Sequence, residues 1–389
     1  MTKVAIFTSG RAEYGLLTPL IDELKEHPEF EVGLFVTGMH LSHEFGHSVN
    51  QIEANSHVIW ERIEGLLSGD SESAICKSLA LTTLGMSEAL QRHQPDILFL
   101  LGDRYELLAA AQAATIHRIP IGHIHGGETT EGAFDEAIRH AITKMSHLHF
   151  TSTDIYRQRV IQMGESPQKV FNVGAMGLDN ITKLNPLSRQ QLSEDLKLDF
   201  DKKTFLITYH PVTLEDKTPK WAVMELLDAL SELNESNFIF THPNSDPNSR
   251  EILPLVRDFV ESHAPNAILV ENLGMLRYLS VLKIAAAVIG NSSSGIIEAP
   301  LLNTATINIG SRQRGRIAGN SIIQCDDDQD EILNAIRESQ SKSFQRNMLS
   351  FKNPYGYGNA SSQIVDILSK IKLDKILIKK FNDLDNIRI

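Results

Sequence analysis

Short apolar runs alternate with amphipathic segments along most of this chain, and no other feature limits its fold more. The runs Val4–Thr8, 96–101 and 204–209 are each long enough for a buried parallel strand. The segments between such runs carry apolar residues at helical spacing, as Leu20 and Leu24 do after the first run. This strand–helix alternation predicts an α/β protein built on doubly wound parallel sheets.

The length indicates how many sheets to expect. A chain of 389 residues is too long for one typical core, and the alternation restarts after a connection near 172–187. We therefore predict two Rossmann-like domains, 1–178 and 179–371, facing a central cleft. The last helix, 359–371, is a candidate to pack back on the first domain. Residues 372–389 form a tail rich in lysine and asparagine, for which the sequence indicates no function.

Composition excludes several classes of protein. The net charge of −12 argues against a general nucleic-acid or membrane-surface binder. The two cysteines, Cys76 and Cys325, are too few for a disulfide framework or a cysteine-based zinc site, and they fit a reducing cytosol. The N-terminus lacks the apolar core of a signal peptide, and no apolar run reaches the ~18 residues of a membrane span. We expect a cytoplasmic protein.

The stretch 284–298 has the pattern of an anion site. An apolar run ends at Gly290, and Ser292, Ser293 and Ser294 follow before a helical pattern resumes. The first N–H groups of a helix and the serine hydroxyls would bind a phosphate, and Gly295 would let it approach the backbone. Glu298 suits the vicinal hydroxyls of a ribose instead. The stretch therefore favours a nucleotide diphosphate, although an ordinary serine N-cap would give the same pattern.

Polar clusters follow the other predicted strands as well. In open parallel sheets, ligands bind at the carboxyl ends of the strands, so these clusters are expected to face one cleft. Each is weak evidence alone, but together they indicate a site. The clusters are Ser9–Arg11, Gly102–Arg104, His125–Glu128, Tyr209–Thr213, Thr241–Asp246, Gly290–Gly295 and Gly310–Arg316.

The two halves of the chain differ in the chemistry of these clusters. The first half is rich in carboxylates and imidazoles, which suit proton transfer: Asp103, His125, Glu128, Asp135 and His140. The second half carries groups that bind phosphate and ribose: the serine turn, Glu298 and Arg312, with His210 beside them. Neighbouring acids in a partly closed cleft would push their pKa values apart, which would provide one acid and one base.

A metal site is the alternative for part of the first half. His123 and His125 alternate on a predicted strand and could point the same way, close to Glu128. No further ligand is obvious, and a strand that enters a sheet often buries such residues. We therefore expect no metal.

The motifs resemble those of a known family, the hydrolysing UDP-N-acetylglucosamine 2-epimerases of bacterial sialic-acid biosynthesis, which have the GT-B fold. The resemblance runs from Val4 to about Ile371. The motifs appear in the family's order as Ser9–Gly15, Leu101–Arg104, His123–Glu128, Asp135–Lys144, His210–Thr213, Ile289–Gly295 and Asn308–Gln313.

The resemblance implies a reaction in two halves. UDP leaves C1 of the sugar while the C2 proton is removed, which gives 2-acetamidoglucal. Water then adds at C1 and a proton returns to the other face of C2, which gives free N-acetylmannosamine. No metal or redox cofactor takes part, and the partners are the UDP-sugar substrate and the UDP product. A homo-oligomer, either a dimer or a tetramer, is also expected.

The resemblance also implies roles for individual residues. Asp103, Glu128 and Asp135 are the candidate acids and bases, and His125 stands where some members have a catalytic glutamate. His210 is expected to contact the nucleotide and to help the diphosphate leave. The other candidates for substrate or UDP binding are Arg11, Arg104, Thr213, Asn244, Asp246, Ser292, Ser293, Ser294, Gly295, Glu298 and Arg312.

Several alternatives stay open at this point. The same reaction on UDP-N,N′-diacetylbacillosamine, in a legionaminic-acid pathway, would use the same motifs. A glycosyltransferase of the same fold would need an acceptor site in the acid-rich first half. A nucleotide-sugar sensor without catalysis would have no need for the intact acids Asp103, Glu128 and Asp135.

Overall fold

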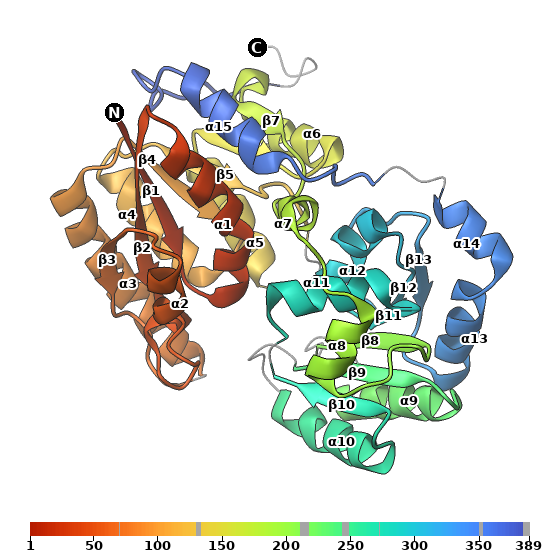
Figure 1. Cartoon of the computed structure of the whole chain (residues 1–389). Coiled ribbons are helices and arrows are strands. Elements are labelled where there is room, and N and C mark those ends of the chain that lie inside the picture. Colours follow the sequence, from red (N-terminus) through yellow and green to blue (C-terminus); the bar gives the residue numbers. More distant parts are fainter. Residues whose placement is uncertain are drawn as a thin grey trace. The chain divides into compact units, whose positions relative to one another are not determined.

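A computed structural model describes residues 1–69, 71–129, 134–210, 218–242, 249–271, 273–349 and 353–383. The chain folds into two compact units (Figure 1). The first unit extends to Asn180 and resumes at Tyr355, and the second extends from Ile181 to Pro354. The helix that carries the chain from the first unit to the second is α7 (Gly177–Lys183). Within the described residues, no helix is long and apolar enough to cross a membrane.

The first unit is built on a seven-stranded sheet with the order β3-β2-β1-β4-β5-β6-β7. Every neighbouring pair is parallel, and the strand order reverses between β1 and β4, which is where open sheets of this kind bind ligands. The strands are β1 (Thr2–Thr8), β2 (Phe30–Thr37), β3 (Ile59–Ile63), β4 (Ile97–Leu101), β5 (Ile121–Ile124), β6 (Leu148–Thr151) and β7 (Val170–Asn172).

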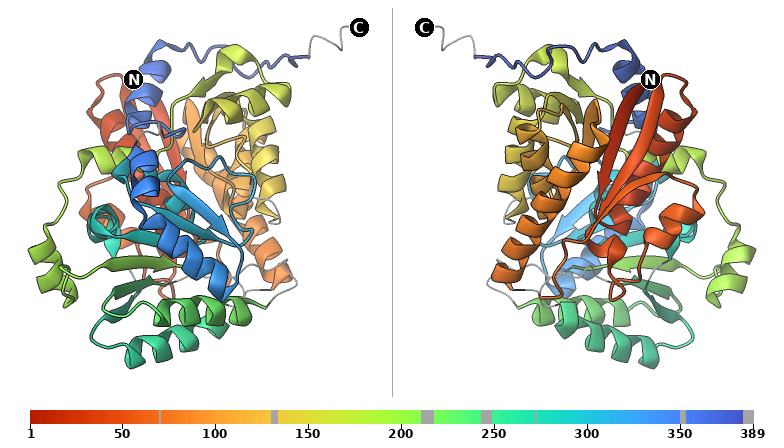
Figure 2. Two further views of the ribbon diagram at one scale, coloured as in Figure 1. Left: turned by 90° about the vertical axis from the view of Figure 1, so that its right-hand side faces the viewer. Right: turned by 90° about the vertical axis from the view of Figure 1, so that its left-hand side faces the viewer.

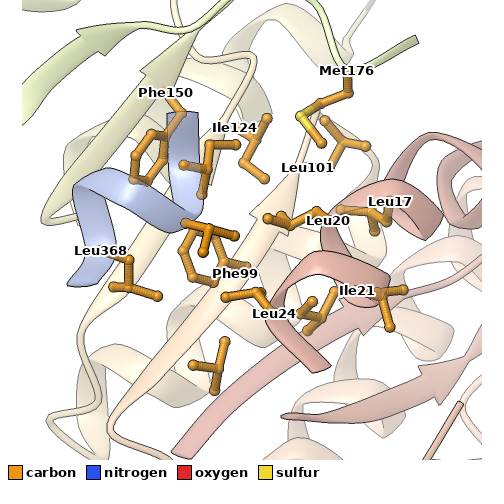
Figure 3. Close-up of a cluster of buried hydrophobic side chains, with 14 of the residues drawn as sticks. Leu17, Leu20, Ile21, Leu24, Phe99, Leu101, Ile124, Phe150, Met176 and Leu368 are labelled. Carbon is orange, nitrogen blue, oxygen red and sulfur yellow. The ribbon is translucent and has the colours of Figure 1, made fainter. Parts of the chain in front are cut away.

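Helices cover both faces of this sheet (Figure 2). On one face α1 and α15 pack together, and Leu20 and Leu24 of α1 join Phe99 and Leu368 in a fully buried cluster (Figure 3). On the other face α3 and α4 pack against each other over a second cluster. The helices are α1 (Arg11–Glu26), α2 (Val49–Ala54), α3 (Glu72–His93), α4 (Tyr105–Ile116), α5 (Asp135–Met145), α6 (Asp154–Gln162) and α15 (Ala360–Lys370).

The second unit is built on a six-stranded parallel sheet with the order β10-β9-β8-β11-β12-β13. Its strand order reverses between β8 and β11. The strands are β8 (Thr204–Thr208), β9 (Asn237–Thr241), β10 (Ala267–Val270), β11 (Ala287–Gly290), β12 (Thr306–Ile309) and β13 (Ile322–Cys325). The helices are α8 (Arg189–Leu196), α9 (Pro219–Ser231), α10 (Ser249–Ser262), α11 (Gly274–Ile284), α12 (Ser293–Ile297), α13 (Gln329–Ser339) and α14 (Lys342–Leu349).

The predicted fold class, two doubly wound parallel sheets, is confirmed. Three strands escaped prediction, β3, β7 and β13, and each lies at a sheet edge. Their residues are mostly half-buried or exposed, so they lack the continuous apolar run of the central strands. The last helix, α15, belongs to the first unit, where it packs on α1.

The chain beyond α15 continues along the first unit. Lys379 reaches the C-terminal end of α5, where its Nζ donates to the carbonyl oxygens of Lys144 (2.9 Å) and Ser146 (2.6 Å). The same Nζ lies 2.8 Å from the buried carboxylate of Glu165. This part of the tail therefore fastens the end of the helix that carries Asp135 and Arg139.

Candidate active site

The polar groups of the first unit collect where β4 and β5 end. Asp103 follows Gly102 at the end of β4, and His125 directly follows β5. His125 has φ +63°, a conformation that L-residues seldom adopt, and its N–H donates to the carbonyl of Phe150 (2.8 Å). Gly127 has φ +79°, and a Cβ there would lie 2.6 Å from the carbonyl oxygen of Tyr156. The turn after β5 is therefore tightly determined by its neighbours.

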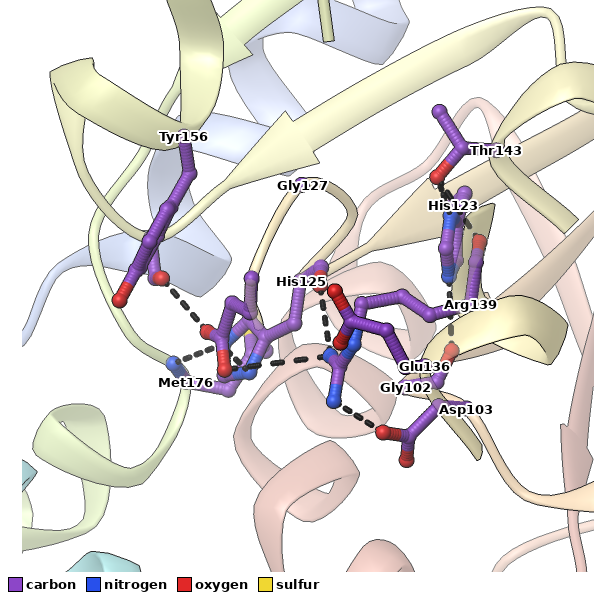
Figure 4. A network of polar contacts seen from close by, with 12 residues as sticks. Gly102, Asp103, His123, His125, Gly127, Glu136, Arg139, Thr143, Tyr156 and Met176 are labelled. Atoms are coloured by element: carbon purple, nitrogen blue, oxygen red, sulfur yellow. Dashed lines mark hydrogen bonds and ion pairs between the residues drawn. The ribbon is translucent and has the colours of Figure 1, made fainter. Parts of the chain in front are cut away.

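Arg139 connects the groups at these two strand ends (Figure 4). It lies on α5, one turn after Asp135, and its side chain is 4 % exposed. Its guanidinium forms an ion pair with Asp103, donates to the carbonyl of His125 (3.0 Å) and lies 3.8 Å from Glu128. Sequence reasoning assigned no role to Arg139. The available signal was its position four residues after Asp135, because i and i+4 share one helix face.

Glu128 is held by several donors although its side chain is only 2 % exposed. The hydroxyl of Ser152 donates to its Oε1 (2.7 Å), and Nδ1 of His125 lies 3.5 Å from the same oxygen. The other ring nitrogen of His125, Nε2, accepts the backbone N–H of Met176 (3.1 Å). Because a backbone N–H can only donate, the neutral ring carries its proton on Nδ1, which faces Glu128. The carboxylate of Glu128 thus accepts from Ser152 and faces the Nδ1 proton of His125.

Asp135 is an acid of this group with a raised pKa. Burial raises the pKa of Asp135 to about 6, and the negative charge of Asp103 adds to the increase, while Arg104 and Arg139 oppose it. At neutral pH a proton can therefore pass to or from Asp135 at small cost, as general acid–base catalysis requires.

His123 and His125, the two histidines considered as metal ligands, form hydrogen bonds with different partners. Nε2 of His123 donates to the carbonyl of Gly102 (2.8 Å), and its Nδ1 lies 3.1 Å from the hydroxyl of Thr143. Burial lowers the pKa of His123 to about 3, so the ring is neutral. His125 is used by Glu128 and Met176, as described above. Within the described ranges, no group of three or more His, Cys, Asp or Glu side chains could hold a metal ion.

The remaining candidates of the first unit are placed as follows. Arg11 is the first residue of α1 and is exposed. Arg104 forms two hydrogen bonds with the buried carboxylate of Glu106, at 3.1 and 3.2 Å. His140 bonds Glu136 (3.0 Å) rather than the Arg139 group. Near Arg104, burial raises the pKa of Glu13 to about 8, and sequence reasoning had assigned Glu13 no role.

A buried amide, Asn291, organises the corresponding site of the second unit. Its Oδ1 accepts the backbone N–H of His210 (2.7 Å), and its Nδ2 donates to the carbonyl of His210 (2.8 Å). Its own carbonyl accepts from Arg312 (3.0 Å) and Gln313 (2.8 Å). Asn291 thus ties the end of β8 to the turn after β12. Burial, together with the charge of Arg312, lowers the pKa of His210 to about 3.

The serine turn follows directly. Ser292 caps α12, and its hydroxyl accepts the N–H of Ser294 (3.4 Å). Ser293 is half-buried. Ser294 accepts a hydrogen bond from the hydroxyl of Tyr278 (2.7 Å). Burial raises the pKa of Glu298, and a hydrogen bond with the Ser294 side chain opposes this increase.

Two further features of this turn bear on the expected anion site. The helix expected after the serines is only five residues long, so its dipole contributes little to an anion site. Gly295 faces Thr306, and a Cβ there would lie 2.6 Å from the Thr306 methyl group. The packing of α12 on β12 therefore also requires a glycine at this position. The expected binding residues Thr213, Asn244 and Asp246 lie outside the described residues.

Comparisons with known proteins agree on one family. A family model described as UDP-N-acetylglucosamine 2-epimerase matches residues 22–369. A Campylobacter jejuni protein named GDP/UDP-N,N′-diacetylbacillosamine 2-epimerase (hydrolyzing) is 40 % identical over 98 % of this chain and 99 % of its own length. An Escherichia coli protein named polysialic acid biosynthesis protein P7 is 37 % identical over 98 % of this chain and 96 % of its own length.

A solved structure also shares the fold. The structure of the UDP-GlcNAc 2-epimerase from Neisseria meningitidis bound to UDP-GlcNAc superposes with a TM-score of 0.81, at 21 % sequence identity. The match covers 95 % of this chain and 100 % of that chain. The GT-B fold class predicted from the motifs is confirmed by this agreement.

Proposed function

The chain belongs to the UDP-N-acetylglucosamine 2-epimerase family, and we propose that it is a hydrolysing member of that family. It releases UDP and a 2-epimerised free sugar from a UDP-2-acetamido sugar. The observation that carries this proposal is the group around Arg139, which holds the carboxylates of Asp103 and Glu128 beside an Asp135 of raised pKa. The word "hydrolyzing" in the name of the Campylobacter relative supports the hydrolytic branch.

The proposed reaction needs two proton transfers at the same carbon. In the first half, a carboxylate takes the C2 proton, the C1–O bond to UDP breaks, and a C1–C2 double bond forms. In the second half, water adds its hydroxyl at C1 and C2 receives a proton on the opposite face. Each half therefore uses one group as a base and one as an acid, and the set returns to its starting protonation.

The environments of the carboxyl groups suggest how these tasks are divided. Asp103 is ion-paired with Arg139, which fixes its position for orienting the sugar. Glu128 receives a hydrogen bond from Ser152 and faces the Nδ1 proton of His125, and it serves as a carboxylate on one side of C2. Asp135, with a pKa of about 6, accepts and returns the proton on the other side.

The second unit supplies the groups for the nucleotide. Arg312 carries the positive charge for the diphosphate, and the serine hydroxyls add neutral donors. Glu298 accepts the ribose hydroxyls. His210, whose backbone is fixed by Asn291, is neutral at physiological pH and donates a hydrogen bond to the leaving diphosphate without adding charge.

Two sugars are candidates for the substrate. The name of the Campylobacter relative favours UDP-N,N′-diacetylbacillosamine, which has a C4 acetamido group and a C6 methyl group. The name of the polysialic acid relative favours UDP-N-acetylglucosamine, the donor expected from the motifs. We propose the bacillosamine derivative first, because the relative that carries this name is the more similar of the two.

A single incubation series tests the proposal. The protein is incubated in D₂O with UDP-N-acetylglucosamine, UDP-N,N′-diacetylbacillosamine or GDP-N,N′-diacetylbacillosamine, and the products are followed by NMR. We expect equal amounts of nucleoside diphosphate and free sugar, with the sugar inverted at C2 and deuterated there. A released sugar that keeps its C2 hydrogen would exclude elimination. A sugar that stays attached to UDP after epimerisation would place the chain in the non-hydrolysing branch.

A further inference from the structure

The tail after α15 is rich in lysine, although the chain as a whole is acidic. Residues 370–380 contain five lysines and one acidic residue, Asp374, whereas the whole chain has a net charge of −12. Two of these lysines, Lys370 and Lys379, each form an ion pair with a carboxylate of the first unit. The other three are exposed: Lys372, Lys375 and Lys380. The tail therefore places three exposed positive charges on the surface of an acidic protein.

Contacts on both sides fix this segment against the first unit. Leu373 and Ile376 pack on the buried cluster between α1 and α15. Further along, the ring of Phe381 lies over Gly164, where a Cβ would clash with it, and the N–H of Asn382 donates to the carbonyl of Gly164 (2.9 Å). In both views of Figure 2 the tail, in dark blue, crosses one end of the first unit beside the N-terminus. The lysines are therefore held in a fixed strip of surface.

Between these contacts, aliphatic side chains face the solvent. Ile378 is 77 % exposed and Leu377 is 40 % exposed. Leu377 also lines a groove together with Met1, which is 81 % exposed. Lysines interspersed with exposed apolar side chains are typical of segments that lie on an anionic lipid surface, where the apolar groups enter the interface and the ammonium groups meet the lipid phosphates. A nucleic acid would use the charges but leave the aliphatic side chains in water.

We propose that the tail strip (Lys372, Lys375, Leu377, Ile378 and Lys380) docks the protein on an anionic lipid bilayer. Each lysine near such a surface adds a modest attraction, and the aliphatic side chains add the burial of apolar area. Because either contribution alone is weak, the association needs both and is reversible. The net charge of −12 repels the rest of the chain from the same surface, so the protein approaches lipid with the tail strip first.

The position of the tail strip leaves the candidate active site accessible. The groove beside it includes Thr2, Asp96 and Pro120, which lie at the amino ends of β1, β4 and β5. Asp103 and Glu128 follow the carboxyl ends of β4 and β5, at the opposite edge of the same sheet. A docked protein therefore keeps these carboxylates away from the lipid. The proposal concerns a surface separate from the proposed catalytic groups, so it does not depend on the proposed function.

Co-sedimentation of the full chain with lipid vesicles tests the proposal. The vesicles contain phosphatidylcholine alone, or phosphatidylcholine with about 30 % phosphatidylglycerol. We expect the parent to bind only the vesicles with phosphatidylglycerol at about 0.1 M salt, and to dissociate at about 0.5 M. The triple variant Lys372→Gln/Lys375→Gln/Lys380→Gln should raise the apparent dissociation constant on the order of 100-fold. Ile378→Ser should raise it about 10-fold.

The matched control is Lys197→Gln/Lys203→Gln/Lys220→Gln, which removes the same charge from exposed lysines of the second unit and should bind vesicles as the parent does. Thermal unfolding checks that each variant is folded. A parent that ignores phosphatidylglycerol, or equal weakening in the two triple variants, would overturn the proposal. Tighter binding to an RNA homopolymer than to the vesicles, with no effect of Ile378→Ser, would also overturn it, because the tail strip would then recognise phosphate charge without lipid.

Discussion

The ends of the central strands of the two sheets carry sites of opposite character. In the first unit, charged groups neutralise each other, with Arg139 between Asp103 and Glu128. In the second unit, a neutral amide, Asn291, fixes His210 and Arg312 through hydrogen bonds. A set of coupled charges titrates and can move protons, whereas a neutral scaffold holds its ligand groups in the same state over a wide pH range. The same architecture thus presents two different polar environments at its strand ends.

The pKa values express the same difference. Burial raises the pKa of Asp135 in the first unit to about 6, close to the working pH. In the second unit, burial and the charge of Arg312 lower the pKa of His210 to about 3, which is far below the working pH. We therefore expect the pH dependence of turnover to arise in the first unit. We also expect that His210 does not contribute to any pH dependence of nucleotide binding between pH 5 and 8.

The largest effect is expected from Arg139→Met. This change leaves Asp103 and Glu128 without their shared cation, so turnover should fall about 10³-fold, and the free energy of unfolding should fall by about 3–5 kcal/mol. Affinity for UDP should stay near that of the parent. Initial rates of UDP release, chemical denaturation and calorimetry with UDP measure the three quantities. The control is Arg157→Met, whose guanidinium donates to the carbonyl oxygens of Pro167 and Val170. Equal losses of turnover in Arg139→Met and Arg157→Met would contradict the proposed role of Arg139.

A smaller loss of turnover, on the order of 10²-fold, is expected from Asp135→Asn. The parent's kcat/KM should decline as the pH falls below about 6, where Asp135 becomes protonated, and the variant should lose this decline.

The folded state raises the pKa of Asp135 above its usual 3.8, so ionised Asp135 opposes folding above pH 6. The variant should therefore melt higher than the parent at pH 7.5, and the difference should vanish below about pH 4. Glu136→Gln, on the same helix turn, is the control, and an unchanged pH profile in Asp135→Asn would refute the assignment.

The groups of the second unit that are proposed to bind the nucleotide are tested by Arg312→Ala and Ser292→Ala. Loss of a charge-assisted hydrogen bond costs about 1.5–3 kcal/mol, so Arg312→Ala should weaken UDP binding on the order of 10–100-fold, and Ser292→Ala less. Asp103→Asn in the first unit should leave UDP affinity nearly unchanged. Calorimetry with UDP measures all three variants. If Asp103→Asn weakens UDP as much as Arg312→Ala does, the division between the two sites is wrong.

The smallest effect is expected from Lys379→Ala in the tail. Burial raises the pKa of Glu165, but hydrogen bonds from His149, Lys144 and Lys379 outweigh it and lower the pKa to about 2. This stabilisation is present above the usual pKa of 4.5 and is lost as the pH falls toward 2.

The variant should lose about 1–2 kcal/mol of stability at pH 7, depend less on pH below 4.5, and bind UDP as the parent does. Chemical denaturation at several pH values measures this change. Lys370→Ala is the control, because this lysine is 70 % exposed and pairs with Asp366. Equal stability of the parent and Lys379→Ala would show that the tail does not support α5.

The fold class, the polar clusters at the strand ends and the family could all be predicted from the sequence alone. These conclusions depend on patterns that are local in the chain: the apolar runs of the central strands, the glycines that end them, and short motifs such as Gly102–Arg104. Edge strands such as β3 escaped prediction because half-burial removes the apolar run.

Which of these groups come into contact could be learned only from the folded structure. Arg139 reaches Asp103 and Glu128 because α5 packs beside the ends of β4 and β5, and no local pattern encodes those contacts. The proton on Nδ1 of His125 follows from the N–H of Met176, 51 residues away. Packing against Thr306 also requires Gly295 to be a glycine. Such contacts join residues far apart in the chain, and their partners are set by how the helices and strands pack, which periodicity does not specify.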